Sequence, residues 1–396
     1  MTASTPAIPL TPGPVAWGRT LKAQHRQYGL HDRCQPLPNE ANLPLIPFGH
    51  GRSYGDVALN PEAGLLLTRG LDRFIRFDAA TGVLRCEAGV LLDEILSLVV
   101  PQGWFLPVTP GTRFVTVGGA IANDVHGKNH HREGCFSRHV RALELLRSDA
   151  NRLTCSVSEN ADWFSATCGG LGLTGLITWA ELQLRRIANP WMVGFQERFN
   201  DLERFFQLTE EADRDYEYSV AWIDCASQGT QLGRGIFMAA NHAPAGFVPQ
   251  SAASGQKAIT FPFTPPISLV NGLSLKAFNT LYFHRIRAGR QPLQQHYQPF
   301  FYPLDGILEW NRMYGPKGFH QYQCVVPDTP LQSAQATITQ LLTTISESGQ
   351  GSFLAVLKVC GDVPSPGLLS FPLPGVSLAL DFPERGPKLH QLFEHL

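Results

Sequence analysis

Residues 117–129 read VGGAIANDVHGKN, and residues 47–56 read PFGHGRSYGD. Both stretches are rich in glycine, which lacks a Cβ atom and lets the backbone turn through positive φ. Turns of this kind direct several backbone N–H groups toward one anion. We interpret the two stretches, together with the turn Pro110-Gly111-Thr112, as parts of one cofactor site that grips a diphosphate.

Composition describes an ordinary globular protein. The chain has 396 residues, 43% of them hydrophobic, which is enough for about two domains with large cores. A formal net charge of −1 gives no broad basic surface, so we expect no nucleic-acid partner. The eight cysteines form no C-x-x-C pair and the N-terminus lacks a secretory signal, which favours reduced thiols in the cytoplasm. No run reaches the roughly 20 apolar residues of a membrane-spanning helix.

Strands and helices follow one another without a regular βαβ repeat, which favours an α+β fold. Apolar patterning predicts strands at 43–48, 64–67, 74–78, 83–87, 140–147, 152–157, 176–184, 216–223, 233–239, 353–359 and 376–382, and helices around 92–99, 161–167, 201–208 and 331–345. We expect a flexible leader at 1–16, one domain at 17–188, and a second at 189–396 with a sizeable antiparallel sheet. Residues 243–268 are rich in Pro, Ser and Gly, and we expect them to form a mobile loop.

The glycine motifs resemble those of the vanillyl-alcohol-oxidase (PCMH-type) superfamily of FAD-linked oxidoreductases. The second motif, continued by His130 and His131, is most similar to the decaprenylphosphoryl-ribose oxidase branch. The resemblance covers roughly residues 17–383. It implies a two-domain flavoprotein, with an FAD-binding domain followed by a substrate domain.

Residues 170–175, GLGLTG, also satisfy the dinucleotide pattern G-x-G-x-x-G. A Rossmann fingerprint follows a strand and opens a helix. Here a helix-like stretch precedes the glycines and a strand follows them, so we disfavour nicotinamide binding. The resemblance places this loop beside the flavin instead.

A second alternative is a metal site among His126, His130, His131, Cys135 and His139. Imidazole and thiolate groups suit zinc, but no acidic or second cysteine ligand completes a familiar set. We therefore expect no metal. The resemblance implies instead that His126 and Lys128 face the flavin and the substrate.

Carried over by matching motifs, the resemblance implies non-covalent FAD, because Arg52 stands where relatives with covalent flavin have histidine. His126 is the catalytic base, with Lys128 holding a phosphate or polarising an oxygen. The implied cofactor contacts are Gly49, His50, Gly51, Arg52, Ser53, Tyr54, Gly55, Pro110, Gly111, Thr112, Val117, Gly118, Gly119, Ala120, Ile121, Asn123, Asp124, His126, Gly127, Asn129, Gly175 and Ile177.

The implied substrate contacts are Tyr54, Trp222, Gln321, Gln323 and Lys358. The alternative, left open, is that Trp222 is a core residue and the glutamines lie on a strand surface. Phe301 and Ala379 stand where these relatives tend to carry tyrosine and cysteine.

The resemblance implies oxidation of a secondary sugar hydroxyl, most plausibly on the ribose of a polyprenyl-phosphoryl ribose. The keto product would pass to a separate reductase of the short-chain-dehydrogenase type for epimerisation to arabinose. The alternatives are another sugar, alditol or lactone as substrate, or a non-catalytic remnant that only binds. The apolar stretch 259–275 is expected to touch the inner membrane peripherally.

Relatives continue past the segment that matches Phe382 and Pro383 with a helix and then a return to the flavin domain. The returning segment carries a tyrosine and a lysine near the flavin. Residues 388–396 match the start of that helix, and we expect the returning segment to be missing from this sequence.

Overall fold

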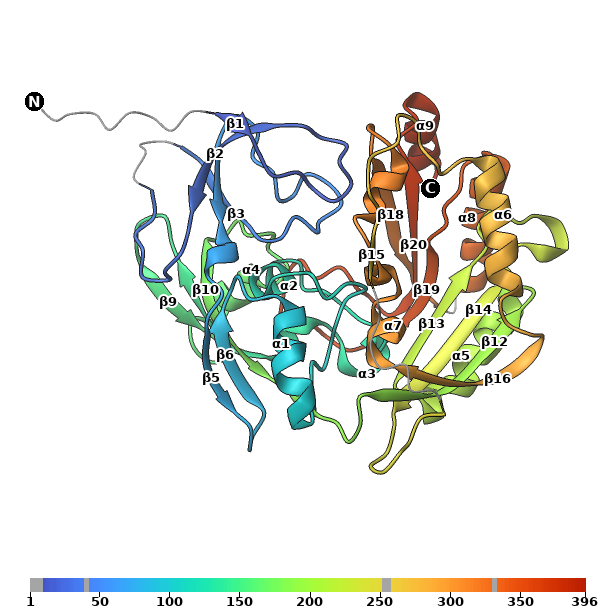
Figure 1. Ribbon diagram of the computed structural model, residues 1–396, viewed down its shortest axis with the longest axis horizontal. Coiled ribbons are helices and arrows are strands. Elements are labelled where there is room, and N and C mark those ends of the chain that lie inside the picture. The colour runs from blue at the N-terminus through green and yellow to red at the C-terminus, as the bar shows by residue number, and fades with distance from the viewer. Residues whose placement is uncertain (1–9, 39–42, 251–257, 330–332) are drawn as a thin grey trace, which may run out of the picture.

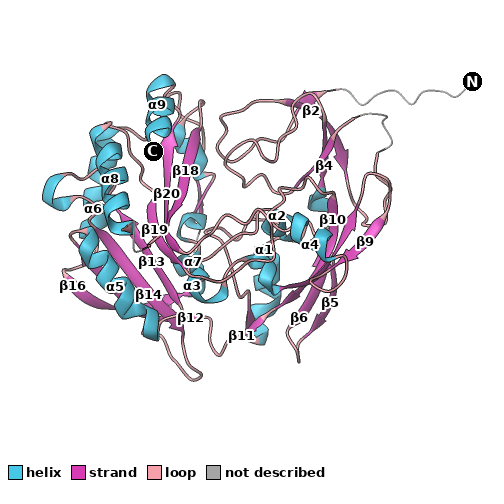
Figure 2. Ribbon diagram, turned by 180° about the vertical axis from the view of Figure 1, so that it is seen from behind, coloured by secondary structure: helices cyan, strands magenta, loops and turns pink. Residues whose placement is uncertain are grey.

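The computed structural model describes residues 10–38, 43–250, 258–329 and 333–396. Two lobes lie side by side: the first half of the chain builds one, and the second half builds the other (Figure 1). The same division appears from behind, with β-sheet in both lobes (Figure 2). Together with the mixed helix content, this is the α+β fold expected from the sequence.

The first glycine stretch directly follows β3 of a small sheet, whose strand order is β1-β2-β4-β3. Its strands are β1 (Thr11–Pro12), β2 (Gln24–Gly29), β3 (Leu45–Phe48) and β4 (Gly64–Leu67). Strands β2 and β3 pair in parallel with the buried β4. The Thr68 hydroxyl donates to the Phe48 carbonyl at 3.0 Å, so the end of β3 is held where residues 49–56 begin.

The second glycine stretch lies against an antiparallel sheet with the order β5-β6-β10-β8-β9. The strands are β5 (Phe74–Asp78), β6 (Val83–Glu87), β8 (Val140–Leu146), β9 (Arg152–Cys155) and β10 (Leu176–Gln183). Helices α1 (Leu92–Val99), α2 (Val117–Ala122), α3 (His130–Glu133) and α4 (Ala161–Thr167) accompany them. A short ribbon pairs β7 (Trp104–Phe105) with β11 (Arg185–Arg186).

The second lobe is a seven-stranded sheet with the order β16-β12-β14-β13-β19-β20-β18. Its strands are antiparallel: β12 (Trp191–Phe199), β13 (Tyr218–Ile223), β14 (Gly235–His242), β16 (Gly289–His296), β18 (Phe319–Val326), β19 (Ala355–Cys360) and β20 (Gly375–Pro383). Helices α5 (Leu202–Asp215), α8 (Ala334–Glu347) and α9 (Pro387–His395) bury their apolar stripes against one face. Helix α6 (Gly272–His284) packs against Trp222 and Ile236 of the other face.

One apolar core crosses between the lobes. It joins Leu84, Val90 and Ile121 of the first lobe with Tyr218 and with residues of the short helix α7 (Tyr297–Phe301) of the second. The boundary at residues 188 and 189 stays a prediction. All strands of the seven-stranded sheet come after this boundary in the sequence, whereas the apolar core contains residues from both sides of it.

The strands and helices predicted in the first lobe are confirmed, most of them to within two residues. The prediction omitted β2, β12, β16, β18 and α6, as well as the short elements β1, β7, β11, β15 (Ile259–Thr260), β17 (Ile307–Leu308), α2, α3 and α7. Strand β16 reads GRQPLQQH and β18 reads FHQYQCVV, so neither shows the apolar alternation that identifies a strand. Of the expected loop 243–268, residues 251–257 lie outside the described part, and Ile259–Thr260 forms strand β15, paired with β17 (Ile307–Leu308).

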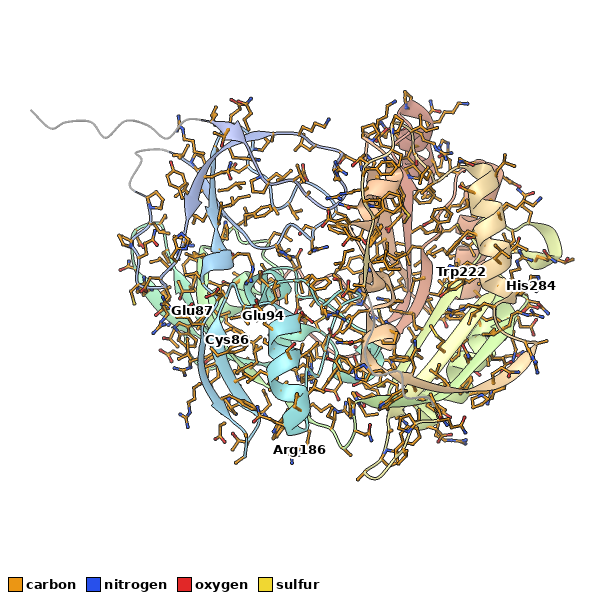
Figure 3. All side chains as sticks on the ribbon, viewed as in Figure 1. Cys86, Glu87, Glu94, Arg186, Trp222 and His284 are labelled. Carbon is orange, nitrogen blue, oxygen red and sulfur yellow. The ribbon has the colours of Figure 1, made fainter. Side chains whose placement is uncertain are left out.

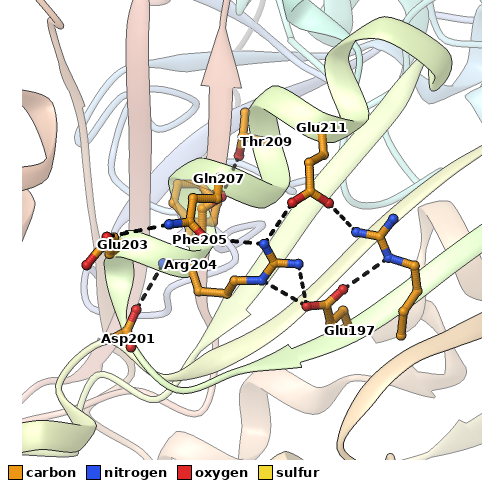
Figure 4. A network of polar contacts seen from close by, with 9 residues as sticks. Glu197, Asp201, Glu203, Arg204, Phe205, Gln207, Thr209 and Glu211 are labelled. Carbon is orange, nitrogen blue, oxygen red and sulfur yellow. Dashed lines mark hydrogen bonds and ion pairs between the residues drawn. The ribbon is translucent and has the colours of Figure 1, made fainter.

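A polar network fastens α5 to the edge of the seven-stranded sheet (Figure 4). Glu197 on β12 is largely buried, and its carboxylate accepts from Arg204 of α5 at 2.7 Å and from Arg290 of β16 at 3.1 Å. Glu211 of α5 accepts from the same two arginines. Asp201 begins the helix by accepting from the Arg204 N–H at 2.9 Å. One carboxylate therefore ties two strands to a helix.

Replacing Glu197 by alanine is expected to lower the free energy of unfolding by about 1–3 kcal/mol. The change leaves two half-buried guanidinium groups without their main acceptor. Asp215→Ala removes an exposed ion pair with Arg214 and is the matched control, with no measurable change expected. Urea unfolding of the three proteins measures the difference, and equal midpoints would contradict a role for this network.

Candidate functional site

The two glycine stretches meet. A Cβ atom added to Gly49 would lie 2.5 Å from the Thr116 hydroxyl oxygen, so the backbones can approach this closely only because residue 49 has no side chain. Thr116 caps α2 by accepting from the Gly119 N–H at 3.1 Å. Gly51 adopts φ of +63°, which turns the first stretch back toward the second. The predicted pairing of the two stretches is therefore present.

Both stretches line a cavity of about 1070 Å³ between the lobes. Its walls also include residues of β13, β18 and β19 and of the segment 299–310. Pockets for small ligands typically measure about 300–1,000 Å³, so this one has room for a dinucleotide-sized group together with part of a second ligand.

The backbone N–H groups of the first stretch indicate an anion-binding site. Within the described residues, no intramolecular hydrogen bond is donated by the N–H groups of residues 49–55. Residues 49–54 line the cavity, so their N–H groups are available to a ligand bound there. A row of unused donors on a cavity wall is therefore the arrangement that a diphosphate requires.

Most of the residues expected to contact the cofactor line this cavity. They are Gly49, His50, Gly51, Arg52, Ser53, Tyr54, Pro110, Gly111, Thr112, Gly118, Gly119, Asn123, His126, Gly127, Gly175 and Ile177. Lys128 and all five expected substrate contacts, Tyr54, Trp222, Gln321, Gln323 and Lys358, line it as well. Six expected cofactor contacts do not, namely Gly55, Val117, Ala120, Ile121, Asp124 and Asn129.

Five of these six residues are buried or have other contacts, and a place beside the cofactor stays a prediction for all six. Val117, Ala120 and Ile121 form the inner face of α2 and are fully buried in the core. Asn129 donates to the Pro107 carbonyl at 2.9 Å and to Glu217 at 3.2 Å. The place of Gly55 is open, since a Cβ there would meet nothing within 4 Å.

Asp124 holds a segment of the other lobe. Its Oδ1 accepts from the Ser137 N–H at 2.9 Å, and its Oδ2 accepts from the hydroxyls of Ser365 and Ser370. This clasp fixes residues 363–371 across the site. Phe371 then stacks on His126, with ring centroids 6.0 Å apart. The sequence contained no periodic or motif signal for this segment.

His126 lies where the two lobes meet. Its Nε2 accepts from the Gln323 side-chain amide at 3.1 Å, and its Nδ1 is buried without a partner among the described groups. Burial, and next the charge of Lys358, hold the pKa of His126 well below 6.5. The imidazole is therefore neutral at pH 7 and able to accept a proton.

Two lysines give the cavity a positive charge. Lys128 donates to the Phe301 carbonyl at 3.0 Å, and burial, with the nearby Lys358, lowers its pKa to about 7. Burial also lowers the pKa of Lys358. Neither lysine takes part in an ion pair within the described chain. Unbalanced cations in an enclosed site favour an anionic ligand.

Two glutamines of β18 line the cavity. Gln321 donates its amide N–H to Asp381 at 3.0 Å. Asp381 is fully buried, and burial raises its pKa to about 8, so it is largely protonated at pH 7. Both glutamines line the cavity, and their contact with a substrate stays a prediction.

Trp222 is both a cavity residue and a packed one. Its ring lies 4.6 Å from that of Tyr282, and its indole donates to the Phe353 carbonyl at 2.9 Å. Figure 3 shows Trp222 in the second lobe. Arg285 covers the same Tyr282 ring at 3.9 Å, and both residues line the cavity. Tyr282 and Arg285 were not predicted, because they belong to α6 and its C-cap, which the sequence analysis did not identify.

Arg52 stands at the position where the resemblance implies histidine in relatives with covalent flavin. Its guanidinium lies 4.1 Å from the centroid of the Trp17 ring, and burial lowers its pKa. The neighbouring His50 directs Nδ1 to the Phe114 carbonyl at 2.8 Å, so that nitrogen is already engaged.

Comparison with known proteins agrees with this geometry. The FAD binding domain family matches residues 36–156. The chain is 34% identical over 399 residues to decaprenylphosphoryl-β-D-ribose oxidase of Mycolicibacterium smegmatis, covering 96% of this chain and 85% of that protein. It is also 32% identical to an uncharacterized protein in mprA 5'region of Streptomyces coelicolor, covering 78% of this chain and 84% of that protein.

The chain is 30% identical to D-lactate dehydrogenase of Anaerostipes hadrus, in a match that covers 39% of this chain and 33% of that protein. It spans less of the chain than the first two matches do. The glycine stretches, the shared cavity and the long match to an oxidase together establish the assignment. The chain is a member of the PCMH-type family of FAD-dependent oxidoreductases, and FAD is its cofactor.

Proposed function

We propose that this enzyme oxidises a secondary hydroxyl on the ribose of a polyprenyl-phosphoryl ribose. One observation carries the proposal: diphosphate donors, a neutral histidine and two unpaired lysines line one cavity. The relative covering most of this chain is named for such a substrate. Bound FAD supplies the hydride acceptor, and the protein has to supply the positions and the base.

Residues 49–54, together with Gly111 and Thr112, would hold the diphosphate of non-covalent FAD through their backbone N–H groups. Support comes from the unused donors in the first stretch and from the contact of Gly49 with Thr116. Arg52 would add charge beside the cofactor. Asp124, in contrast, would act only through the segment that it clasps.

His126 would take the hydroxyl proton on its Nε2 once the substrate hydroxyl displaces the Gln323 amide N–H from that nitrogen. Phe371 and Gln323 would fix the plane of the imidazole, and Phe371 would exclude water from it. Lys128 or Lys358 would hold the phosphate of the substrate or an oxygen of the sugar. The carbonyl oxygen of Gln321, whose amide N–H donates to Asp381, would accept from a second sugar hydroxyl.

Gly49→Ala is expected to weaken FAD binding by about tenfold or more while the chain stays folded, because the added Cβ pushes the two glycine stretches apart. Gly55→Ala is the matched control, since its Cβ enters open space. Flavin absorbance after gel filtration, followed by FAD titration, measures both. Equal affinities would exclude the contact of Gly49 with Thr116 as part of the cofactor site.

His126→Ala is expected to retain FAD while oxidation of a prenyl-phosphoryl ribose falls by about 10²–10⁴-fold, the range for losing a general base. His284→Ala changes a histidine outside the cavity and should behave as the unmodified enzyme. The keto product is measured by mass spectrometry, with alditols and lactones as competing substrates. Unchanged turnover would exclude His126 as the base. A preference for an alditol or lactone would contradict the proposed ribose substrate.

We propose that the apolar surface beside the cavity meets a membrane and that a short-chain-dehydrogenase-type reductase receives the keto product. Within the described residues, no helix is long and apolar enough to cross a bilayer. Ile259, Ile267 and Leu273 are 73–85% exposed. Strand β15 pairs with β17, whose residues Ile307 and Leu308 line the cavity. A lipid tail leaving the cavity would therefore meet apolar side chains.

The double variant Ile267→Ser, Leu273→Ser is expected to lose flotation with liposomes that contain anionic lipid, because it removes apolar area that would enter the interface. Val157→Ser changes an exposed apolar residue of the other lobe and should float as the unmodified chain does. Absence of flotation for the unmodified chain, or equal flotation of all three proteins, would rule out this surface as the membrane contact.

A further inference from the structure

A cluster of three potential metal ligands lies on the face of the seven-stranded sheet turned away from the cavity. His320 lies on β18, Glu384 directly follows β20, and His390 lies on α9. Gln321 and Gln323 of β18 face the cavity, and the side chains of His320 and Tyr322 between them pack toward α9. None of the three residues belongs to the flavin site. In Figure 1, α9 stands at the end of the sheet beside β18 and β20.

The ligand atoms converge on one point. Nε2 of His320 lies 2.6 Å from Oε2 of Glu384, and Nε2 of His390 lies 3.2 Å from the same oxygen. All three ligand atoms lie within 4.8 Å of one another. Zinc bonds to nitrogen and oxygen of about 2.0–2.2 Å separate ligand atoms by roughly 3–3.5 Å. A small rotation of the Glu384 carboxylate therefore suffices to admit the ion.

Supporting contacts already orient the ligands. The second carboxylate oxygen of Glu384 accepts from the Gly386 N–H, and the Glu384 N–H donates to the Gly318 carbonyl. The His320 ring lies edge-on to Phe393 of α9, with centroids 6.0 Å apart. The side chain of His390 is 58% exposed, so water has access to a fourth coordination position.

We propose that His320, Glu384 and His390 bind a zinc ion that clips α9 to the outer face of the sheet. Two imidazoles and one carboxylate form a ligand set that zinc uses with an open fourth position. Magnesium and calcium prefer oxygen ligands, and only one of these three ligand atoms is oxygen.

The clip would add to an existing apolar contact. Leu389 and Leu392 of α9 are buried in the core beneath the sheet, and the Tyr322 hydroxyl donates to the Leu396 carbonyl at 3.0 Å. Metal bound across β18, the end of β20 and α9 would join three segments that otherwise meet through these contacts. Binding to the folded chain alone would raise its unfolding temperature.

The test uses the full chain, purified without a polyhistidine tag and stripped with a chelator. Zinc is titrated against a chromophoric competitor, and the unfolding temperature is recorded with and without it. We expect one zinc per chain at this site and a higher unfolding temperature. His390→Gln and Glu384→Gln should each weaken zinc binding by about 100-fold or more, beyond the effect typical of an outer contact.

His395→Gln is the matched control, because His395 is an exposed histidine of the same helix outside the cluster. It should bind zinc as the unmodified chain does. Far-UV circular dichroism of each stripped variant shows whether α9 and the sheet remain folded. The proposal is overturned if zinc binds no more tightly than magnesium, or if His390→Gln and Glu384→Gln retain full affinity.

Discussion

The contact between Gly49 and Thr116 is the constraint on which the site depends. Each partner is anchored in a different sheet of the first lobe. Phe48, just before Gly49, is held by Thr68 next to β4, whereas the N–H groups of Val117 and Gly118 donate to Val90 and Ala88 at 2.8 Å. The packing of the two sheets therefore sets the distance between the glycine stretches. A side chain at residue 49 would separate them and disperse the donors that face the cavity.

A second constraint is the union of the lobes. His126 comes from the first lobe, whereas Gln323, Lys358 and Phe371 come from the second. The shared apolar core and the clasp around Asp124 hold these groups in one place. Burial also makes the charged form of the cavity lysines unfavourable until an anion binds. Binding of the cofactor and the phosphorylated substrate would relieve the same electrostatic cost, which couples occupancy of the site to its stability.

Prediction from the sequence succeeded where local pattern and structure coincide. The helix around residues 92–99 buries Leu92, Ile95, Leu96 and Val99, and the strand before Gly49 ends at Phe48, as expected. Prediction failed for β16 and β18, where one strand face is polar because it borders a cavity or solvent. The partners of Asp124 were not predictable either. Neighbours in a motif share a short stretch of backbone, but adjacent side chains diverge, and the Asp124 carboxylate accepts from Ser365 and Ser370 of a distant segment.

The sequence by itself determined the two glycine bends, the α+β alternation and the residue types that suit a flavin, since these depend on backbone freedom and periodicity within short windows. Only the tertiary structure decided which distant groups meet. Gln323 reaches His126 across 197 positions, and His320 meets Glu384 across 64. Such pairs depend on how sheets and helices pack, because the distance between two segments in space is set by the core between them and not by the residues along the chain.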